Sequence, residues 1–447
     1  MFESLLVANR GEIARRIIAT ANGMGIRTIA VYSEADADLP FVREADEAVL
    51  LGPAAPAQSY LDVDAVLAAA KQTGAQAVHP GYGFLSENAD FAEAVTAAGL
   101  TWVGPSPDAM RSMGDKIAAR NRMAAAGVPV APGTPDPVPD AQAALAAAHE
   151  IGYPVMVKAA AGGGGIGMSA AFNDEELTAA YETARTRAER FFSDPAILLE
   201  KYVPSARHIE VQILGLADGT VVALGERDCS VQRRHQKVAE ESPSPAVTPE
   251  IRAAIMDAAV KAGEAVGYRN AGTVEMLFDT ATGDAWFLEM NTRLQVEHPV
   301  TEAVTGLDLV AEQLRIAAGE APSFDAANVP TASGHAIELR IYAEDPKRFL
   351  PGPGAITEWV EPTGDGVRVD AGYESGNTVT PFYDPLLAKL IVHGSNRQEA
   401  LAMARAAVEG FTIVGPKNNL PFFTELLAND EFVRGDYDTG LISRMRG

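Results

Sequence analysis

The chain of 447 residues is too long for one compact core, so we expect two to four subdomains of roughly 150 residues each. Its formal net charge of −24 disfavours nucleic acid and anionic membrane surfaces as partners, because both carry negative charge. Hydrophobic residues make up 47% and charged residues 21%, which is typical of a soluble globular enzyme.

Cysteine content and the N-terminus bear on the compartment. Cys229 is the only cysteine, which excludes an intramolecular disulfide and a cysteine-rich zinc site and fits a reducing cytoplasm. The N-terminus has no signal-peptide pattern, and no apolar stretch approaches the roughly 18–20 residues that span a bilayer. We therefore expect a cytoplasmic protein that does not enter a membrane.

Short β-rich runs alternate with helical patterns through the first hundred residues. The expected strands are 4–9, 27–33, 76–80 and 101–104. The helices between them are expected at 11–25, around 61–73 and near 87–98. This alternation predicts a parallel sheet with helices on both faces.

The middle and the end of the chain have different patterns. Residues 113–128 predict one connecting helix, and the Pro-rich stretch 131–140 predicts a boundary after it. A smaller module is expected from about 131 to 203. From residue 208 the strands are longer and predicted to be antiparallel, with helices at about 249–267, 299–318 and 397–409.

A glycine run, Gly162–Gly165, follows an expected strand that ends at Lys158. Without side chains, its backbone N–H groups could approach a phosphate closely, and the run would act as a flap. It is neither a Walker A loop nor a dinucleotide fingerprint. Lys158 and Lys116 favour a phosphate site, while an ordinary flexible loop remains an alternative.

Two apolar runs flank the turn sequence DTATGD and predict a hairpin at 274–291. With the turn centred near Thr282, Glu275 faces Glu289 and needs a compensating cation. Asn291 shares the face of Glu289 by period-2 alternation. Two carboxylates and an amide oxygen predict a site for Mg²⁺ or Mn²⁺.

Arg293, Gln295 and Glu297 continue this alternation and would point into the metal site if the chain stays extended. A guanidinium beside an amide could hold bicarbonate, and a nearby carboxylate could act as general base on it. A second basic cluster predicts another part of an anion site, although a solvated strand end is equally compatible with it. It contains Gln232, Arg233, Arg234, His235 and Lys237.

Together these motifs resemble the biotin carboxylases of the ATP-grasp superfamily, and the resemblance covers essentially the whole chain. The most specific motifs are MNTRLQVEHPVTE at 290–302 and HPGYGFLSEN at 79–88. The other matching segments are 5–17, 113–116, 158–165, 206–212, 227–237, 274–278, 340–346, Gly376 and 380–391.

The resemblance implies a multidomain fold of α/β and α+β type. It comprises a doubly wound N-terminal domain at 1–114, an ATP-grasp domain at 115–330 and a mixed C-terminal domain at 331–447. A mobile, glycine-rich lid at 131–203 belongs to the ATP-grasp domain. The N-terminal domain is not expected to bind a dinucleotide.

The implied activity is ATP-, Mg²⁺- and bicarbonate-dependent carboxylation of biotin through carboxyphosphate, the first half-reaction of a biotin-dependent carboxylase. The expected partners are a biotin carboxyl carrier protein or domain and a carboxyltransferase subunit, with the chain itself a homodimer. No Ala-Met-Lys-Met segment marks a biotin-attachment lysine, so biotin is expected from another chain or from another part of a longer one. Acetyl-CoA or propionyl-CoA is the expected acceptor, while other acyl-CoA thioesters, pyruvate and urea stay open.

The family's functional residues match positions of this chain. Those implied to bind ATP, with the glycine loop as the lid, are Lys116, Lys158, Gly163, Gly164, Gly165, Glu200, Lys201, Val203, His208, Gln232, His235 and Leu277. Those implied to bind metal are Glu275, Glu289 and Asn291. Bicarbonate binding is implied for Lys237, Arg293, Gln295 and Val296. Glu297 is implied as the base, Arg340 as the residue that steadies the biotin enolate, and Tyr82 as a neighbour of biotin.

In two lid positions where the family usually has basic residues, this chain has Ile166 and Ser169. This departure predicts weaker nucleotide affinity or altered closure, without loss of chemistry. Two alternatives remain: another ATP-grasp ligase that joins an acyl phosphate to an amine, and a non-catalytic subunit. The motif at 290–302 argues against the first, and the presence of Lys237 and Glu297 argues against the second.

Overall fold

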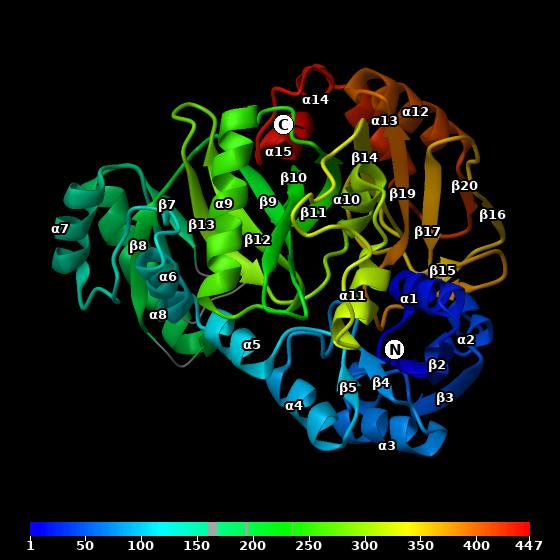
Figure 1. Cartoon of the computed structure of the whole chain (residues 1–447). Helices are drawn as coiled ribbons and strands as arrows, with labels where there is room; N and C mark the ends of the chain where they lie inside the picture. The colour runs from blue at the N-terminus through cyan, green and yellow to red at the C-terminus, as the bar shows by residue number, and fades with distance from the viewer. Residues whose placement is uncertain (160–167, 193–194, 235) are drawn as a thin grey trace.

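The computed structural model describes residues 1–159, 168–192, 195–234 and 236–447 (Figure 1). Within these residues the chain forms a five-stranded sheet, an eight-stranded sheet, a three-stranded sheet and two short ribbons. No helix in these ranges is both long enough and apolar enough to cross a membrane.

The N-terminal sheet is parallel in the order β3-β2-β1-β4-β5, which confirms the predicted strand–helix alternation. Leu5, Leu6 and Val7 of β1 are fully buried, as expected for a central strand covered on both faces. The strands are β1 Ser4–Val7, β2 Arg27–Ser33, β3 Glu47–Gly52, β4 Ala77–His79 and β5 Thr101–Trp102. The helices are α1 Gly11–Gly23, α2 Pro40–Glu44, α3 Val63–Thr73 and α4 Ala89–Ala97, with short 3-10 helices η1 Glu34–Asp36 and η2 Pro56–Gln58.

Two helices, α5 Pro107–Gly114 and α6 Lys116–Ala125, lead out of this sheet, so the prediction of a single helix at 113–128 is wrong. The break falls at Asp115, whose backbone is extended. Its carboxylate accepts hydrogen bonds from the amides of Ile117 and Ala118 and so caps α6. The cap places Lys116 in the first turn of α6.

A small module follows, which lies at the left of Figure 1. Its antiparallel sheet has the order β7-β6-β8, and the glycine run connects β6 to β7, as predicted. The module has a separate hydrophobic core that includes Ala144, Val157, Tyr181 and Leu199. Its elements are α7 Ala141–Ile151, β6 Val155–Ala159, β7 Ser169–Ala171, α8 Asp174–Phe192 and β8 Ile197–Lys201.

The large sheet is antiparallel, as predicted, in the order β13-β12-β9-β10-β11-β14-β19-β17. Its strands are β9 Ala206–Gly215, β10 Val221–Arg233, β11 Gln236–Ser242, β12 Asn270–Asp279, β13 Ala285–Asn291, β14 His335–Tyr342, β17 Val367–Ala371 and β19 Leu386–Gly394. Helices α9 Pro249–Ala265, α10 His298–Thr305, α11 Leu309–Ala317 and α12 Arg397–Gly410 accompany it. The single helix predicted at 299–318 is wrong, because Gly306 adopts a left-handed conformation and ends α10.

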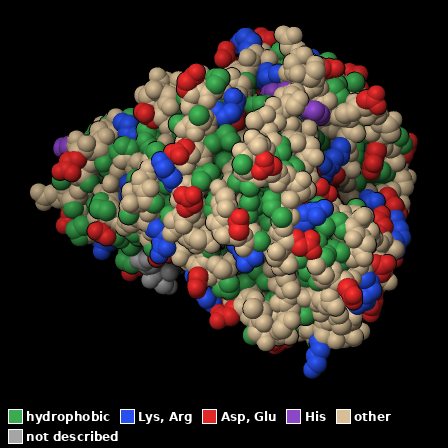
Figure 2. Space-filling model, in the orientation of Figure 1, with side chains coloured by type: hydrophobic (Ala, Val, Ile, Leu, Met, Phe, Trp, Pro, Cys, Tyr) green, Lys and Arg blue, Asp and Glu red, His purple; other side chains and the backbone are tan. Residues whose placement is uncertain are grey.

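The remaining elements complete the C-terminal part: β15 Gly354–Ala355, β16 Glu358–Val360, β18 Thr378–Val379, β20 Thr412–Val414, α13 Leu420–Ala428, α14 Asp430–Arg434 and α15 Leu441–Arg446. One hydrophobic core runs from Leu5 and Ile17 near the N-terminus to Phe422 and Ile442 near the C-terminus. The two ends of the chain therefore pack together around the large sheet. On the face drawn in Figure 2, Lys and Arg lie among Asp and Glu, so an anion site must be a local cluster.

Candidate active site

The predicted pair is confirmed: β12 and β13 pair antiparallel, with Glu275 opposite Glu289, and the register shifts by one residue between Glu275 and Met276. The amide of Asn291 donates from Nδ2 to Oε1 of Glu275 over 2.7 Å. Glu289 forms an ion pair with Lys116, whose Nζ lies 3.3 Å from Oε2. The hairpin therefore brings two carboxylates, an amide and a lysine from α6 to one end of the large sheet.

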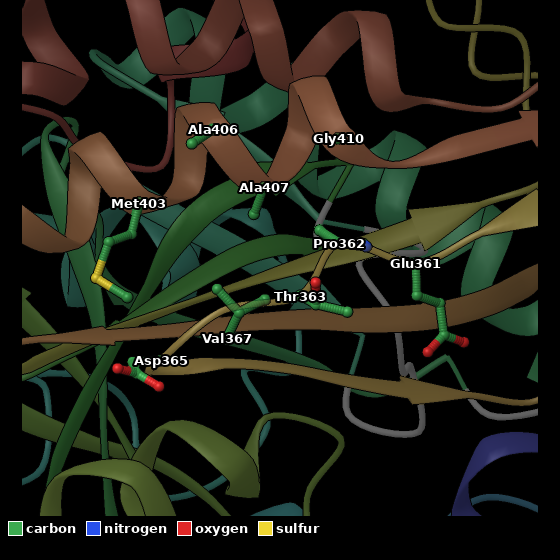
Figure 3. A pocket seen from close by; sticks show the side chains of 9 residues that line it. All are labelled: Glu361, Pro362, Thr363, Asp365, Val367, Met403, Ala406, Ala407 and Gly410. Carbon is green, nitrogen blue, oxygen red and sulfur yellow. The ribbon is translucent and has the colours of Figure 1, made fainter.

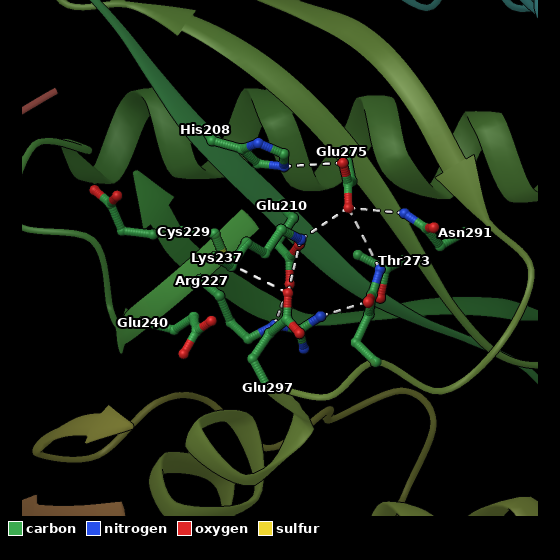
Figure 4. Close-up of polar contacts among 12 residues, drawn as sticks. His208, Glu210, Arg227, Cys229, Lys237, Glu240, Thr273, Glu275, Asn291 and Glu297 are labelled. Atoms are coloured by element: carbon green, nitrogen blue, oxygen red, sulfur yellow. Dashed lines mark hydrogen bonds and ion pairs between the residues drawn. The ribbon is translucent and has the colours of Figure 1, made fainter. Parts of the chain in front are cut away.

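Lys237 of β11 lies at the centre of the polar cluster in Figure 4. Its ammonium donates to Glu210 over 2.6 Å, to Glu275 over 2.8 Å and to Glu297 over 2.7 Å. A lysine ammonium has three N–H donors, so these contacts use all of them. Burial would lower the pKa of Lys237, but the three carboxylates outweigh it and raise that pKa well above its ordinary value.

Glu297 immediately precedes α10 and is fully buried. Besides Lys237, its Oε2 accepts a hydrogen bond from Nη2 of Arg340 over 2.9 Å. Burial would raise the pKa of Glu297, but Lys237, Arg340 and Arg227 hold it well below its ordinary value. Glu297 is therefore ionised, and these three cations make its carboxylate a weaker base than an exposed one.

The predicted extended path to Glu297 is wrong. Strand β13 ends at Asn291, and the chain turns at 296–297, where Glu297 has φ −81° and ψ 12°. The turn is set by α10, which begins with Pro at its second position and so fixes the backbone entering the helix. The side chain of Glu297 nevertheless joins the predicted cluster through Lys237.

Arg293 and Gln295 form the predicted pairing of a guanidinium with an amide. Nη1 of Arg293 donates to Oε1 of Gln295 over 2.9 Å, and Nη2 donates to Oδ1 of Asn291 over 3.1 Å. Nε of Arg293 also donates to Glu87 over 2.9 Å, which ties the site to the loop at 79–88. Gln295 lies at the edge of the cluster, with Nε2 3.4 Å from Oε1 of Glu275.

His208 and Gln232 extend the cluster along β9 and β10. Nε2 of His208 lies 2.9 Å from Oε2 of Glu275, and Gln232 contacts Nδ1 of His208 over 2.9 Å. Burial would lower the pKa of His208, but Glu275 outweighs it and the pKa rises. Leu277, two residues after Glu275 on β12, pairs with His208 across the strands and is half-buried.

The other predicted ATP residues lie in or beside the small module. Lys158 of β6 and Glu200 of β8 form an ion pair. The ammonium of Lys201 donates to the carbonyls of Gly152 and Tyr153, so this side chain is engaged within the module. Val203 follows β8 and is buried.

Some predicted residues are not joined to the Lys237 cluster. Tyr82 is half-buried, and its buried hydroxyl has no hydrogen-bond partner among the residues that the structure describes. Ser169 opens β7 with an exposed side chain. Four predicted positions and one departure lie outside the described residues: Gly163, Gly164, Gly165, His235 and Ile166.

Three buried charged residues of this cluster, Glu210, Arg227 and Glu240, were not predicted from the sequence. Glu210 of β9 contacts both Lys237 and Arg227, with Nε of Arg227 2.5 Å from its Oε1. Glu240 lies 2.7 Å from Nε of Arg340. The alternation of His208, Glu210 and Gln212 along β9 was the available signal, because residues two apart share one face of a strand.

Glu275, Glu289 and Asn291 fit the donor set that Mg²⁺ requires. All three offer hard oxygen atoms from adjacent strands. Burial would raise the pKa of Glu275, but Lys237 and His208 outweigh it, so the carboxylate is charged. An alternative trio, His208, Glu210 and Glu275, has ligand atoms within 4.8 Å of one another, but its imidazole is less suited to Mg²⁺.

A cavity of about 360 Å³ lies elsewhere, between the segment 361–367 and α12 (Figure 3). Val367, Met403 and Ala407 give it an apolar side, and Glu361 and Asp365 give it an acidic side. None of the residues predicted to bind ATP, metal, bicarbonate or biotin lines it. The candidate site is therefore the charged cluster and not this cavity.

Three family models match the chain in succession. They are the biotin carboxylase N-terminal domain at residues 1–110, the ATP-binding domain of the carbamoyl-phosphate synthase L chain at 115–323 and the biotin carboxylase C-terminal domain at 338–444. "Biotin carboxylase 2" of Bacillus subtilis is 52% identical over 99% of this chain and 100% of its own length. A pyruvate carboxylase subunit of Methanothermobacter thermautotrophicus is 48% identical over 100% of this chain and 90% of its own.

A solved structure agrees with these relatives. It is the biotin carboxylase domain dimer of Hydrogenobacter thermophilus 2-oxoglutarate carboxylase, in complex with MgADP, ADP and bicarbonate. It is 43% identical, superposes with a TM-score of 0.92 and covers 99% of this chain and 98% of its own.

The three-part fold and the charged cluster define an ATP-dependent ligase of the ATP-grasp class. The chain belongs to the biotin carboxylase family. It catalyses the ATP-dependent carboxylation of biotin within a biotin-dependent carboxylase, and it uses ATP, Mg²⁺ and biotin held on a carrier.

Proposed function

We propose that the cluster around Lys237 activates bicarbonate in the first half-reaction of a biotin-dependent carboxylase. The observation that carries this proposal is the position of the Lys237 ammonium, within 2.8 Å of Glu210, Glu275 and Glu297. A buried cation beside an ionised carboxylate is suited to bind a small anion and to take its proton.

In this proposal Arg293, Gln295, Val296 and Lys237 bind bicarbonate. The guanidinium of Arg293 and the amide of Gln295 are already in contact, so they can present a planar set of donors to a planar anion. Glu297 removes the proton from bicarbonate as general base. Its low pKa is set by Lys237, Arg340 and Arg227, so a change in those contacts as an anion binds would make Glu297 more basic.

We place the nucleotide between the small module and the hairpin. Glu200, Lys201 and Val203 would border the adenine, and His208, Gln232, His235 and Leu277 would line the rest of the pocket. Lys116 and Lys158 would neutralise phosphate charge, together with the glycine run Gly163, Gly164 and Gly165. Mg²⁺ held by Glu275, Glu289 and Asn291 would supply further neutralisation of the transferring phosphoryl group.

Arg340 and Tyr82 are proposed to serve the biotin half of the site. Arg340 is buried, and its guanidinium contacts Glu297 on one side and Glu240 on the other. A guanidinium stays charged at any physiological pH, so it can stabilise the negative oxygen of a biotin enolate. The shared contact with Glu297 would place the two substrates close together.

The same proposal covers the wider organisation. The domains are placed at 1–114, 115–330 with the lid at 131–203, and 331–447. The expected partners are a biotin carboxyl carrier protein or domain and a carboxyltransferase subunit, in the cytoplasm. A homodimer is proposed because the Hydrogenobacter relative is described as a dimer. Acetyl-CoA and propionyl-CoA are the first acceptors to test, and pyruvate is the next because one relative is named for it.

The activity is tested by the release of ADP from ATP in the presence of Mg²⁺ and bicarbonate, with and without free biotin. We expect biotin to stimulate the release and bicarbonate to be required. ATP turnover that ignores both compounds would contradict the proposed function.

The role of Glu297 is tested by Glu297→Gln, which keeps the shape of the side chain and removes its basicity. We expect biotin-dependent turnover to fall by about 10²–10⁴-fold, as is typical for loss of a general base, while ATP binding measured by calorimetry is retained. The matched control is Glu264→Gln on the exposed face of α9. Normal turnover in Glu297→Gln would show that the base is another group.

A further inference from the structure

Lys389 is a fully buried lysine that none of the roles proposed above uses. It lies on β19, and its Nζ donates to the backbone carbonyl of Val296 over 3.0 Å. Oε2 of Glu12 lies 3.1 Å from the same nitrogen, and Oδ2 of Asp370 lies 3.8 Å from it. Lysines are almost never fully buried unless they are paired, and Glu12 and Asp370 supply the negative charge that pairs with Lys389.

The partners of Lys389 come from distant parts of the chain. Glu12 belongs to α1, Asp370 to β17, and Val296 to the turn between β13 and α10. The ammonium therefore joins the first helix, the far edge of the large sheet and the loop that follows the metal hairpin. Figure 1 shows α1 and β17 on the same side of the molecule.

The strand register places Lys389 beside the proposed site. Lys389 is opposite Arg340 on β14 and opposite Asp370 on β17. Directly opposite residues of antiparallel strands point to the same face, so Lys389, Arg340 and Asp370 form one row. Arg340 contacts Glu297 from this row, while Lys389 contacts the residue just before Glu297.

The hydrogen bond from Lys389 to the Val296 carbonyl affects the orientation of the neighbouring side chains in the turn. Gln295 reaches Glu275, and Glu297 reaches Lys237 and Arg340, so their directions depend on the backbone at Val296. A backbone carbonyl held by a buried, charged donor is fixed more firmly than one held by a neutral donor or by water. Without this donor the Val296 carbonyl would lose its charged partner, and the turn would be held only by the bonds of residues 295 and 297 to α10.

We propose that Lys389 is a positioning residue for the bicarbonate-binding turn at 295–297, and that Glu12 and Asp370 hold it in place. The inference rests on the proposed function, which assigns bicarbonate to Gln295, Val296 and Glu297. It predicts a selective effect, because Lys116, Lys158 and Glu200 of the proposed ATP pocket come from other elements. Loss of the ammonium should weaken bicarbonate binding and leave nucleotide binding almost unchanged.

The test is Lys389→Met, which keeps the length of the side chain and removes its charge and donors. We expect the KM for bicarbonate in biotin-dependent ADP release to rise about 10-fold or more, while the KM for ATP stays within about 2-fold; a 10-fold change corresponds to roughly 1.4 kcal/mol. The matched control is Lys261→Met, since Lys261 is an exposed lysine on α9 that pairs only with Asp257 among the described residues. A parallel rise in both KM values, or an unchanged bicarbonate KM in a folded variant, would overturn the inference.

Two further arms keep the test decisive. If Lys389→Met does not fold, as judged by circular dichroism, Glu12→Gln removes the charge of the nearer anchor, 3.1 Å from Nζ of Lys389, and should raise the bicarbonate KM by a smaller factor. An unchanged value in this variant would count against the inference. The wild-type protein separates failure of the Lys389 inference from failure of the proposed function. If the wild type shows no bicarbonate-dependent turnover, the proposed function is wrong. If the wild type shows such turnover, the bicarbonate KM of the variants tests the role of Lys389 alone.

Discussion

Glu241 lies on β11, the strand that also carries Lys237, but its side chain contacts residues outside the proposed active site. It is buried on β11, where it accepts from His335 over 2.6 Å, from Arg397 over 2.6 Å and from Tyr437 over 2.5 Å. Burial would raise the pKa of Glu241, but His335 and Arg397 outweigh it and lower the pKa to about 2. These contacts tie β11 to β14, α12 and the C-terminal segment.

The depressed pKa of Glu241 gives a pH dependence with a definite sign. Its contribution to stability is fully present above the ordinary carboxyl value of 4.5 and is lost as the pH falls toward 2. We expect Glu241→Gln to lower the free energy of unfolding at pH 7 by about 3 kcal/mol, measured by urea denaturation. The difference from wild type should shrink as the pH is lowered through this window. Glu409→Gln, at an exposed position on α12, is the control and should change stability by less than about 0.5 kcal/mol.

At the scale of elements, the hairpin β12–β13 carries the proposed metal site. Glu289→Gln removes one of two opposed carboxylates and leaves the strand pairing intact. We expect the Mg²⁺ concentration for half-maximal activity to rise about 10-fold, because one charged oxygen ligand is lost. The control is Asp284→Asn, an exposed acid in the turn of the same hairpin. An unchanged metal requirement in Glu289→Gln would contradict the assignment.

The hairpin also shows what the sequence could predict. The pairing of Glu275 with Glu289 was predicted from the turn and the period-2 alternation, which are local properties, but the register shift between Glu275 and Met276 was not. The extended path predicted after Asn291 was wrong, because the chain turns at 296–297 to enter α10. The charged row beside Arg340 was missed as well. Lys389 finds its partners in α1 and the 296 turn, and no local pattern reports a contact between segments so far apart.

At the scale of the whole molecule, two hydrophobic cores differ in their connections. The large core joins residues from both ends of the chain, whereas the core of the small module is built only from residues between 138 and 199. The segment just before the module is held by Pro129 and Val130, which bond and pair with Phe287 of β13. The module therefore packs around its own core, and it begins directly after a segment that is bonded to β13.

This organisation predicts that the module opens without global unfolding. In native-state hydrogen exchange we expect the amides of α7 and β6 to exchange through a lower-energy opening than those of β9 and β12. MgATP should slow amide exchange in the module, because a bound nucleotide stabilises its closed position. Exchange in α12 should stay unchanged, since no residue of α12 belongs to the proposed nucleotide site. Equal opening energies for the module and the large sheet would contradict this prediction.

The three hydrogen bonds of Lys237 have a consequence for the order in which the substrates bind. All of its donors are occupied by Glu210, Glu275 and Glu297, so an incoming anion must compete with carboxylates of the same molecule. These internal competitors act at a high effective concentration, which weakens the affinity of the free enzyme for bicarbonate. On the proposed function, Glu275 would serve as a ligand of Mg²⁺ once the metal nucleotide binds, and its hydrogen bond with Lys237 would then be released. We therefore expect an ordered sequence in which the metal nucleotide enters first and makes room for the second substrate.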